Sequence, residues 1–313
     1  MKLTKKYIGF IFLLSAVLLV GCSGDESPNA DPTGDEKEIR LNAEVWQVME
    51  GTRATTYDNA PALQGEIEGF KCIAYDTGTA TVNTTSNVNS VVKWNSLASK
   101  WEFEDGIHKW PDSGSLDFFA YMPASPDAYI TDVIYAVNAT LEPRPYFTCD
   151  MTQTVNKEFI YALTTGQDKE HQGSTGVTMT FKHPFARIYF QLSNVSGSHV
   201  TINSISISGE DFYKKAKCTF DGTTSTWSEK DDDTKGSLGS LSINTPYIVI
   251  PHDYGSSKTI TVNATWDDWS NVTTNVTSSP LSINWVAGRS YTYTLTLSKY
   301  ALKVGIDKYT EQW

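Results

Sequence analysis

Residues 291–297 read Tyr-Thr-Tyr-Thr-Leu-Thr-Leu, so large apolar side chains alternate with threonine over the whole stretch. Because successive side chains of an extended chain point to opposite faces, this stretch predicts a β-strand with one buried and one solvent-facing side. The alternation returns after a short break in residues 302–306, and residues 39–45 show it again near the other end of the chain. The sequence therefore predicts two-faced strands near both ends of the folded part.

Most of the remaining apolar residues also fall into short strand-like stretches, separated by Gly, Asn, Asp or Pro. The clearest of them are residues 118–121, 177–181, 188–192, 202–207, 247–250 and 260–266. Helical spacing is nearly absent, and the best candidate for a helix is the short stretch 154–163. Strands about 10 to 15 residues apart with turn signals between them are typical of β-sandwiches. We therefore predict an all-β protein of two tandem β-sandwich domains with few short helices.

The composition predicts a folded protein and excludes one class of partner. The chain has 313 residues, 40% of them hydrophobic and 12% aromatic, which is enough for two cores at about 150 residues per domain. Its formal net charge is −11, and no run of Lys and Arg offsets the repulsion from a phosphate backbone. Nucleic acid is therefore excluded as the main partner.

The sequence lacks the residue patterns that most enzymes need. The five His residues are scattered, the four Cys residues form no C-x-x-C pair, and neither a G-x-S-x-G nor an H-E-x-x-H motif is present. The three Asp residues at 231–233 lack the ligand spacing of a calcium loop, so a solvated turn is expected there. We predict no catalytic, cofactor-binding or metal-binding residues and no cofactor, and the chain is not expected to be an enzyme.

Residues 266–269 read Trp-Asp-Asp-Trp, a combination of side chains that occurs in sugar-binding sites. On a strand Trp266 and Trp269 point to opposite faces, so one of them is expected to belong to the core. A glycoside hydrolase needs two carboxylates about 5 to 10 Å apart, and a chain with 36 acidic residues meets this condition by chance. The pattern therefore favours neither a glycan site nor a hydrolase over a core strand.

The first 22 residues have the pattern of an export signal. Lys2, Lys5 and Lys6 precede an apolar run of about 14 residues, which is shorter than the roughly 20 residues of a membrane-spanning helix. The run ends in Leu-Val-Gly-Cys, which resembles a bacterial lipobox, so Cys22 is expected to be acylated and to become the mature N-terminus. The alternative is an ordinary signal peptide with an incidental Cys. Residues 23–38, acidic and rich in Pro, Ser and Gly, are expected to form a flexible tether.

A polar, glycine-rich stretch at residues 164–176 separates two apolar regions. We place the domain boundary there, with an N-terminal β-sandwich domain at residues 39–165 and a C-terminal one at residues 176–313. Three cysteines follow Cys22, namely Cys72, Cys149 and Cys218. Buried free thiols are expected for them, and a disulfide between two of them stays open.

One segment suggests how the chain could be joined to others. The strand-like residues 39–45 are followed by a turn-like stretch, Gly-Thr-Arg-Ala-Thr at 51–55, which has a single basic residue. A protease that cuts after Arg53, before Ala54, would free residues 39–53 as a removable pro-strand and leave an apolar groove with unpaired backbone edges. Such an edge accepts a strand of another chain, and residues 302–306 offer a terminal donor strand.

Six short motifs follow one another along the chain. They are Arg53-Ala54-Thr55, Trp110-Pro111, FFAYMP at 118–123, FKHPFARI at 181–188, YIVIPH at 247–252 and WVAGRSYTY at 285–293. Each motif is weak by itself, but together and in this order they resemble the fimbrillin-like families of anaerobic Gram-negative gut and oral bacteria. The resemblance covers almost the whole chain after the export signal.

The resemblance implies two β-sandwiches of transthyretin-like topology, export as a lipoprotein, trimming by an Arg-specific protease, and polymerisation into pili by donor-strand exchange. Cys22 would then be the lipidated residue and Arg53 the cleavage residue. The implied partners are other pilin subunits, as a homopolymer or with tip and anchor subunits, the outer membrane through the lipid of the precursor, and a host or glycan receptor. The precursor would be an outer-membrane lipoprotein, and the mature form would be part of a cell-surface fimbrium that contributes to adhesion.

Stalk, tip and anchor subunits of such a fibre share this body. Arg53 argues against an anchor, which keeps its lipid, and the residues after 297 argue against a tip, which needs no donor strand. The alternative interpretation is a surface lipoprotein that does not polymerise. It would bind glycan or host protein through exposed aromatic residues such as Trp94, Trp101, Trp266 or Trp269.

Overall fold

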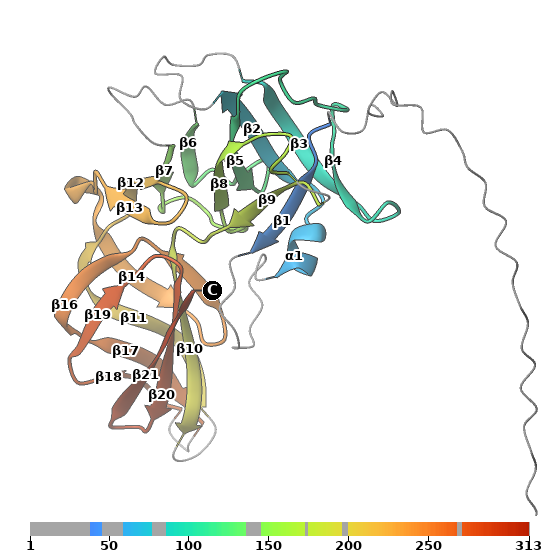
Figure 1. The fold of residues 1–313 in the computed structure, drawn as a ribbon. Coiled ribbons are helices and arrows are strands. Elements are labelled where there is room, and N and C mark those ends of the chain that lie inside the picture. The colour runs from blue at the N-terminus through green and yellow to red at the C-terminus, as the bar shows by residue number, and fades with distance from the viewer. Residues whose placement is uncertain are drawn as a thin grey trace, which may run out of the picture. The chain divides into compact units, whose positions relative to one another are not determined.

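The computed structural model describes residues 38–45, 59–76, 86–135, 145–172, 175–195, 200–267 and 271–312. These residues form an all-β fold, as the sequence predicts (Figure 1). The helices among them are the α-helix α1 (Ala60–Gln64) and the 3₁₀ helix η2 (Asp232–Thr234). Neither of these two helices is long and apolar enough to span a membrane.

A five-stranded antiparallel sheet forms the centre of the first half of the described chain. Its strands, in spatial order, are β4 (Lys100–Phe103), β3 (Val88–Asn95), β2 (Phe70–Asp76), β5 (Leu116–Met122) and β8 (Ile160–Gln167). Both faces of this sheet are buried: Phe118 of β5 belongs to the core on one side and Phe119 to the core on the other. A strand that is covered on both faces has a continuous apolar sequence, which explains the dense run LDFFAYM of β5.

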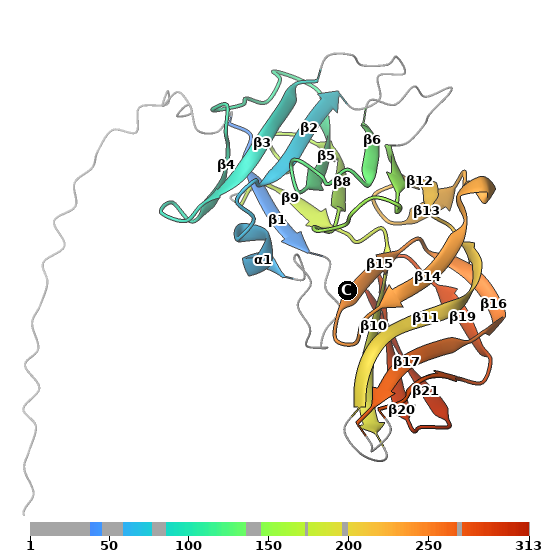
Figure 2. The same ribbon diagram turned by 180° about the vertical axis from the view of Figure 1, so that it is seen from behind.

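A different layer covers each face of the central sheet (Figures 1 and 2). One layer is a parallel pair, β1 (Leu41–Val45) and β9 (Val177–Phe181), whose strands lie side by side in both views. The other layer is an antiparallel sheet of β13 (Ser225–Ser228), β12 (Lys215–Phe220), β7 (Tyr146–Asp150) and β6 (Ile130–Ile134). The central sheet therefore contributes side chains to two separate cores.

The second half of the chain forms a β-sandwich. One sheet contains, in order, β15 (Pro246–Val249), β10 (Ala186–Val195), β20 (Arg289–Leu297) and β21 (Leu302–Gln312), with β10 and β20 parallel. The other contains β14 (Gly236–Leu241), β11 (Val200–Phe212), β17 (Ile260–Trp266) and β18 (Thr273–Thr277). A further antiparallel pair consists of β16 (His252–Lys258) and β19 (Leu281–Trp285).

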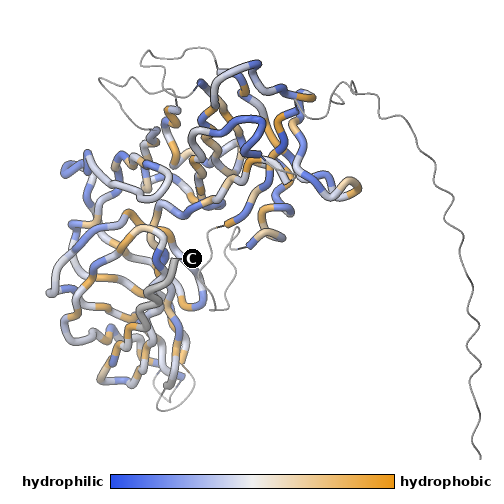
Figure 3. Tube along the Cα trace, viewed as in Figure 1, coloured by the Kyte–Doolittle hydropathy of each residue, from blue (hydrophilic) through white to orange (hydrophobic). Residues whose placement is uncertain are grey.

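Strand β20 confirms the prediction for residues 291–297. Tyr291, Tyr293, Leu295 and Leu297 are buried in the C-terminal core, and the threonines between them lie on the outer side. Figure 3 shows the same change between apolar and polar residues along many of the described strands. The alternation in the sequence thus identifies which face of each strand is covered.

One predicted element is wrong. Residues 154–163 do not form a helix, since their last part belongs to strand β8. Ile160 and Tyr161 are both buried, on opposite faces of the central sheet. A short run that is apolar on both faces has no period that would distinguish a strand from a helix.

The strand pairing crosses the boundary predicted at residues 164–176. β9 and β12 follow this stretch in the sequence, but they pair with β1 and β7, which precede it. The core between the central sheet and the β6–β7–β12–β13 sheet likewise joins Phe147 to Phe185 and Phe220. The division into domains at residues 39–165 and 176–313 stays a prediction, and its two parts share sheets and a core.

Candidate assembly site

Strand β1 lies at an edge and carries one apolar face. Residues 41–45 pair in parallel with β9, and no other strand in the described part of the chain pairs with them. Ile39, Leu41, Ala43 and Val45 are between 4% and 8% exposed and belong to one core of the central sheet. The predicted two-faced strand at residues 39–45 is therefore confirmed.

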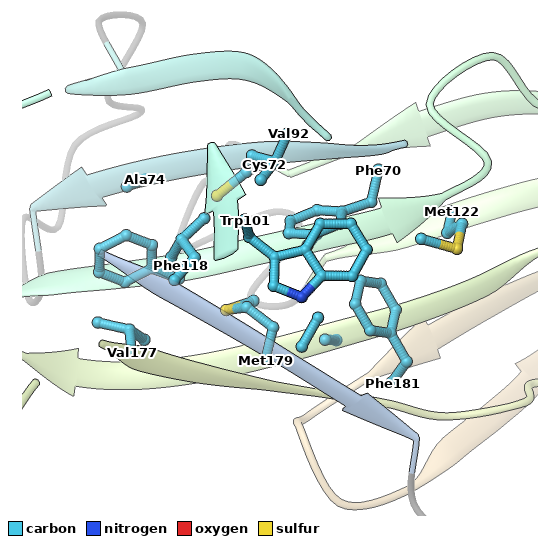
Figure 4. Close-up of a cluster of buried hydrophobic side chains, with 14 of the residues drawn as sticks. Phe70, Cys72, Ala74, Val92, Trp101, Phe118, Met122, Val177, Met179 and Phe181 are labelled. Carbon is cyan, nitrogen blue, oxygen red and sulfur yellow. The ribbon is translucent and has the colours of Figure 1, made fainter. Parts of the chain in front are cut away.

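The apolar face of β1 covers a cluster of buried side chains (Figure 4), over which the blue arrow of β1 passes. We use the name β1-binding surface for five of these residues, which come from β4, β5 and β9: Trp101, Phe118, Val177, Met179 and Phe181. Full burial of a large apolar side chain is worth about 1.5–3 kcal/mol, so this surface would be costly to leave in water. If β1 were removed, another apolar strand would be favoured in its place.

The main chain just before β1 has hydrogen-bond partners on two sides. The N–H of Ile39 donates to the carbonyl oxygen of His108 at 2.9 Å, and the carbonyl oxygen of Arg40 accepts from the N–H of Val177 at 2.7 Å. The side-chain amide of Gln172 makes two further hydrogen bonds to residues 38–40. The beginning of the pro-strand is thus fixed through its backbone.

The three residues predicted as modification sites, Cys22, Arg53 and Ala54, lie outside the described residues. In the sequence, Arg53 falls in the connection between the end of β1 at Val45 and the start of α1 at Ala60. Since both flanking elements belong to the folded part, a cut after Arg53 would separate β1 covalently from everything that follows. Lipidation at Cys22 and cleavage after Arg53 stay predictions.

Helix α1 fixes the chain on the C-terminal side of that connection. The side chain of Asn59 caps the helix by accepting a hydrogen bond from the N–H of Ala62 at 2.9 Å, and Pro61 suits the first turn. Leu63 is fully buried in the core beneath β1. Beyond the helix, Glu66 forms an ion pair with Lys157 at 3.0 Å. The cap, the buried Leu63 and the ion pair thus fix this segment, which also packs against β1.

The predicted donor strand is β21, at the edge of the C-terminal sandwich. It pairs in antiparallel fashion with β20, and a single bridge joins Leu302 to Ser278. Leu302 is buried, whereas Val304 and Ile306 are half-buried against the C-terminal core. Tyr300, in the turn before β21 and two residues before Leu302, is 89% exposed. β21 therefore presents an apolar face that its own sandwich covers incompletely.

The aromatic residues proposed as a binding surface are mostly not on the surface. Trp101 is 6% exposed and Trp266 is 3% exposed, and each belongs to a core. Trp94 is half-buried, and its ring centroid lies 5.5 Å from that of Trp101 in an edge-to-face contact. Trp269 lies outside the described residues. The interpretation as an exposed aromatic binding face is therefore wrong for Trp101 and Trp266.

The acidic run at 231–233 forms a turn around η2, as predicted. Asp231 caps η2 by accepting from the N–H of Asp233 at 2.9 Å, and Asp232 forms an ion pair with Lys235 at 2.6 Å. Among the residues that the structure describes, no group of three or more His, Cys, Asp or Glu side chains is placed to hold a metal ion. The carboxylates of Asp231 and Asp232 thus bind the chain itself.

The three described cysteines, Cys72, Cys149 and Cys218, are free and buried. Burial raises the pKa of the Cys72 and Cys218 thiols well above the usual range and raises the pKa of Cys149 to about 12. A thiol with a raised pKa is a poor nucleophile. These cysteines therefore serve as small apolar core residues.

Gln172 is a site residue that the sequence did not suggest. It lies in the polar stretch 164–176, where a glutamine is expected to be solvated, yet only 3% of it is exposed. No local pattern marks it, because its partners, Glu38 and Arg40, lie more than 130 residues earlier in the sequence.

The fold and the position of β1 define an all-β protein with a peripheral N-terminal strand. The model of the fimbrillin-like family matches residues 52–313, and the chain belongs to this family. It is therefore a fimbrial, adhesion-related subunit of the cell surface, and proteins of this family are structural rather than enzymatic.

Two solved structures share the fold. A fimbrial protein from Bacteroides vulgatus is 16% identical, with a TM-score of 0.55, over 88% of this chain and 100% of that chain. A candidate cell adhesion protein from Bacteroides uniformis is 18% identical, with a TM-score of 0.51, over 87% of this chain and 99% of that chain. A comparison with curated proteins found no match.

Proposed function

We propose that this chain is a structural subunit of a cell-surface fimbrium that polymerises by strand replacement. Cys22 is acylated, and the precursor is held at the outer membrane through its lipid. An arginine-specific protease cuts between Arg53 and Ala54. β1 then leaves, and β21 of a second copy takes its place.

The observation that carries this proposal is the position of β1. It pairs with β9 alone among the described strands, so its departure leaves every other pairing between described strands intact. Its inward side chains nevertheless belong to a core, so its departure exposes the β1-binding surface. A removable strand that leaves an apolar surface is what a replacing strand requires.

The inward residues of β1 and β21 are similar in size and spacing. β1 presents Leu41, Ala43 and Val45, and β21 offers the alternating residues 302, 304 and 306, which are Leu, Val and Ile. Each replacement residue has at least as many apolar carbons as the one it replaces. Burying the additional methyl and methylene groups contributes about 0.8 kcal/mol for each CH₂ equivalent, which favours β21 where the surface can accommodate it.

The lipid explains why a cut is needed before assembly. Acyl chains contribute about 0.8 kcal/mol for each buried CH₂, so an acylated precursor stays at the membrane. Cleavage after Arg53 separates the acylated segment from the folded body. In the same step it disconnects β1 from residues 54–313, which couples release from the membrane to opening of the β1-binding surface.

The test replaces Arg53 in cells that contain an arginine-specific protease. Arg53→Ala is expected to give full-length, membrane-bound monomer whose N-terminus, by mass spectrometry, is acylated Cys22. Arg53→Lys keeps the charge but is not a substrate for such a protease, and it is expected to behave in the same way. Wild-type protein is expected to start at Ala54 and to form fibres. Normal fibres from either variant would refute the proposed cleavage step.

A further inference from the structure

Four hydrogen bonds hold the three residues in front of β1. On one side the N–H of Ile39 donates to the carbonyl oxygen of His108 at 2.9 Å. On the other side the N–H of Arg40 donates to Oε1 of Gln172 at 3.1 Å, and Nε2 of Gln172 donates to the carbonyl oxygen of Glu38 at 3.0 Å. The N–H of Val177 then donates to the carbonyl oxygen of Arg40 at 2.7 Å. All four bonds use main-chain atoms of residues 38–40.

The carboxamide of Gln172 takes the place of one residue's N–H and C=O in a parallel β-ladder. It presents one acceptor and one donor to the strand, as a neighbouring backbone would. Val177, the first residue of β9, continues the same row of hydrogen bonds. Gln172 thus extends the hydrogen-bonding edge of β9 beyond its first residue, Val177.

The backbone around Gln172 holds this side chain in place. The N–H of Gln172 donates to the carbonyl oxygen of Asp168 at 3.2 Å, and its own carbonyl oxygen accepts from the N–H of Gly176 at 3.0 Å. The residue is also buried, at 3% exposure. Because the backbone of Gln172 is already fixed, only its side-chain torsions lose conformational entropy when it binds a strand.

We propose that the side-chain amide of Gln172, the N–H of Val177 and the carbonyl oxygen of His108 form a main-chain clamp for whichever strand covers the β1-binding surface. The clamp first holds β1 and then β21 of a second copy. This inference rests on the proposed function. Because the clamp binds peptide groups and not side chains, strands of different sequence can use it, while the β1-binding surface selects their apolar residues.

The experiment starts from residues 23–313, cut after Arg53 so that β1 is held without a covalent link. Two fluorescent peptides, residues 37–49 and residues 298–312, are then added in separate experiments. Their uptake measures the rate at which the N-terminal segment is released and the affinity with which each peptide replaces it. The variant is Gln172→Met, which keeps the length of the side chain and removes both hydrogen bonds. The matched control is Gln167→Met, which removes a half-buried glutamine whose side-chain amide donates to the carbonyl oxygen of Thr165 nearby.

Gln172→Met is expected to speed release of the N-terminal segment by about tenfold or more, as the loss of two net hydrogen bonds predicts. It is expected to lower the affinity for both peptides by the same factor, because the clamp contacts main-chain atoms, which are the same in both. Gln167→Met is expected to behave as wild type. If Gln172→Met releases the segment at the wild-type rate, or lowers the affinity for only one of the two peptides, the clamp is refuted.

The outcome for the proposed function is separate. If wild-type protein exchanges its N-terminal segment for peptide 37–49 but does not take up peptide 298–312, strand replacement by β21 is refuted, whereas the clamp on β1 is supported. If the cut Gln172→Met protein does not stay folded, hydrogen exchange of the Arg40 amide in uncut protein gives the answer. Faster exchange there in Gln172→Met than in Gln167→Met supports the clamp, and equal exchange refutes it.

Discussion

Gly176 lies directly against the main chain of Arg40. A Cβ atom at position 176 would be 2.5 Å from both the carbonyl carbon and the carbonyl oxygen of Arg40, and 2.8 Å from the nitrogen of Leu41. Distances this short do not occur between real Cβ atoms and backbone, so one of the two segments would have to move. With its φ of +92°, Gly176 also has a conformation that other residues rarely adopt. The position of β1 therefore depends on the absence of a side chain at residue 176.

The variant Gly176→Ala is expected to loosen β1. Its matched control is Gly166→Ala, since Gly166 also has a positive φ, of +65°, but has open space around it. The control is expected to lower the free energy of unfolding by about 1 to 2 kcal/mol, from backbone strain alone. Gly176→Ala is expected to lower it further and to speed hydrogen exchange in residues 41–45 specifically. Equal exchange in the two variants would contradict the close contact with Arg40.

The apolar face of β1 is expected to provide most of its attachment. Leu41→Ala removes a buried side chain and is expected to lower the free energy of unfolding by about 2–4 kcal/mol. Asn42→Ala changes the neighbouring residue on the opposite face. Its free energy of unfolding is expected to stay within about 0.5 kcal/mol of the wild-type value. Urea denaturation of the uncut chain measures both values. A small effect of Leu41→Ala would show that β1 contributes little to the core.

The turn that carries Gln172 is expected to depend on pH through Asp168. Hydrogen bonds from the main chain and ring of His171, and from the N–H of Glu170, hold the pKa of the Asp168 carboxyl below its usual value. A carboxyl with a lowered pKa stabilises the fold above its unfolded-state pKa, and this contribution is lost as the pH falls through the lowered value. Hydrogen exchange of the Arg40 amide is therefore expected to quicken, beyond the intrinsic rate, below about pH 4.

The variant Asp168→Asn is the control for this pH dependence. It keeps a side-chain oxygen that accepts from the two main-chain N–H groups, but it does not titrate. Its exchange at Arg40 is expected to show no additional acceleration between pH 5 and pH 3. If wild type and Asp168→Asn have the same pH profile, the carboxyl of Asp168 does not hold the turn.

The ion pairs of Lys157 are expected to stabilise the chain after α1. Lys157 lies 3.0 Å from the buried carboxylate of Glu66 and 3.3 Å from Glu68. Burial by itself lowers the pKa of Lys157, but the hydrogen bonds and charges of Glu66 and Glu68 outweigh it and raise the pKa. The stabilisation of the fold by these ion pairs is present below the ordinary lysine pKa. It is lost as the pH rises through the raised pKa of Lys157.

Lys157→Met is expected to lower the free energy of unfolding by about 1–3 kcal/mol, because Glu66 loses a cation while its side chain stays buried. Adding Glu66→Gln to this variant is expected to restore part of the loss, which a double-mutant cycle in urea measures. Lys100→Met, which removes an exposed ion pair with Glu102, is expected to change little. Similar losses for Lys157→Met and Lys100→Met would contradict the importance of burial.

The strands were predictable where one face of a strand is covered and the other is not. Residues 39–45 and 291–297 alternate in the sequence, and their apolar residues are buried in the structure. The prediction was wrong at residues 154–163, because the start of β8 is buried on both faces and the period of two disappears there. Helix α1 was also missed, since its five residues depend on the cap by Asn59 and on the buried Leu63 rather than on a helical period.

The site was predictable only in part. The two-faced character of β1 and the alternation of β21 follow from local sequence, and both strands lie at edges. Gln172 and Gly176 could not be identified, because their roles come from contacts with Glu38 and Arg40 across a large separation in sequence. Their polar, glycine-rich surroundings are typical of a linker, and a single sequence holds no record of such distant pairs.

The pairing of β7 with β12 has a mechanical consequence. Because β9 and β12 of the second half pair with β1 and β7 of the first, the first half cannot open under tension without breaking bonds to strands of the second. The C-terminal sandwich has sheets and a core of its own, so it can yield separately. A filament made of such units would therefore lengthen first at its C-terminal sandwiches, while the interlocked halves keep resisting shear.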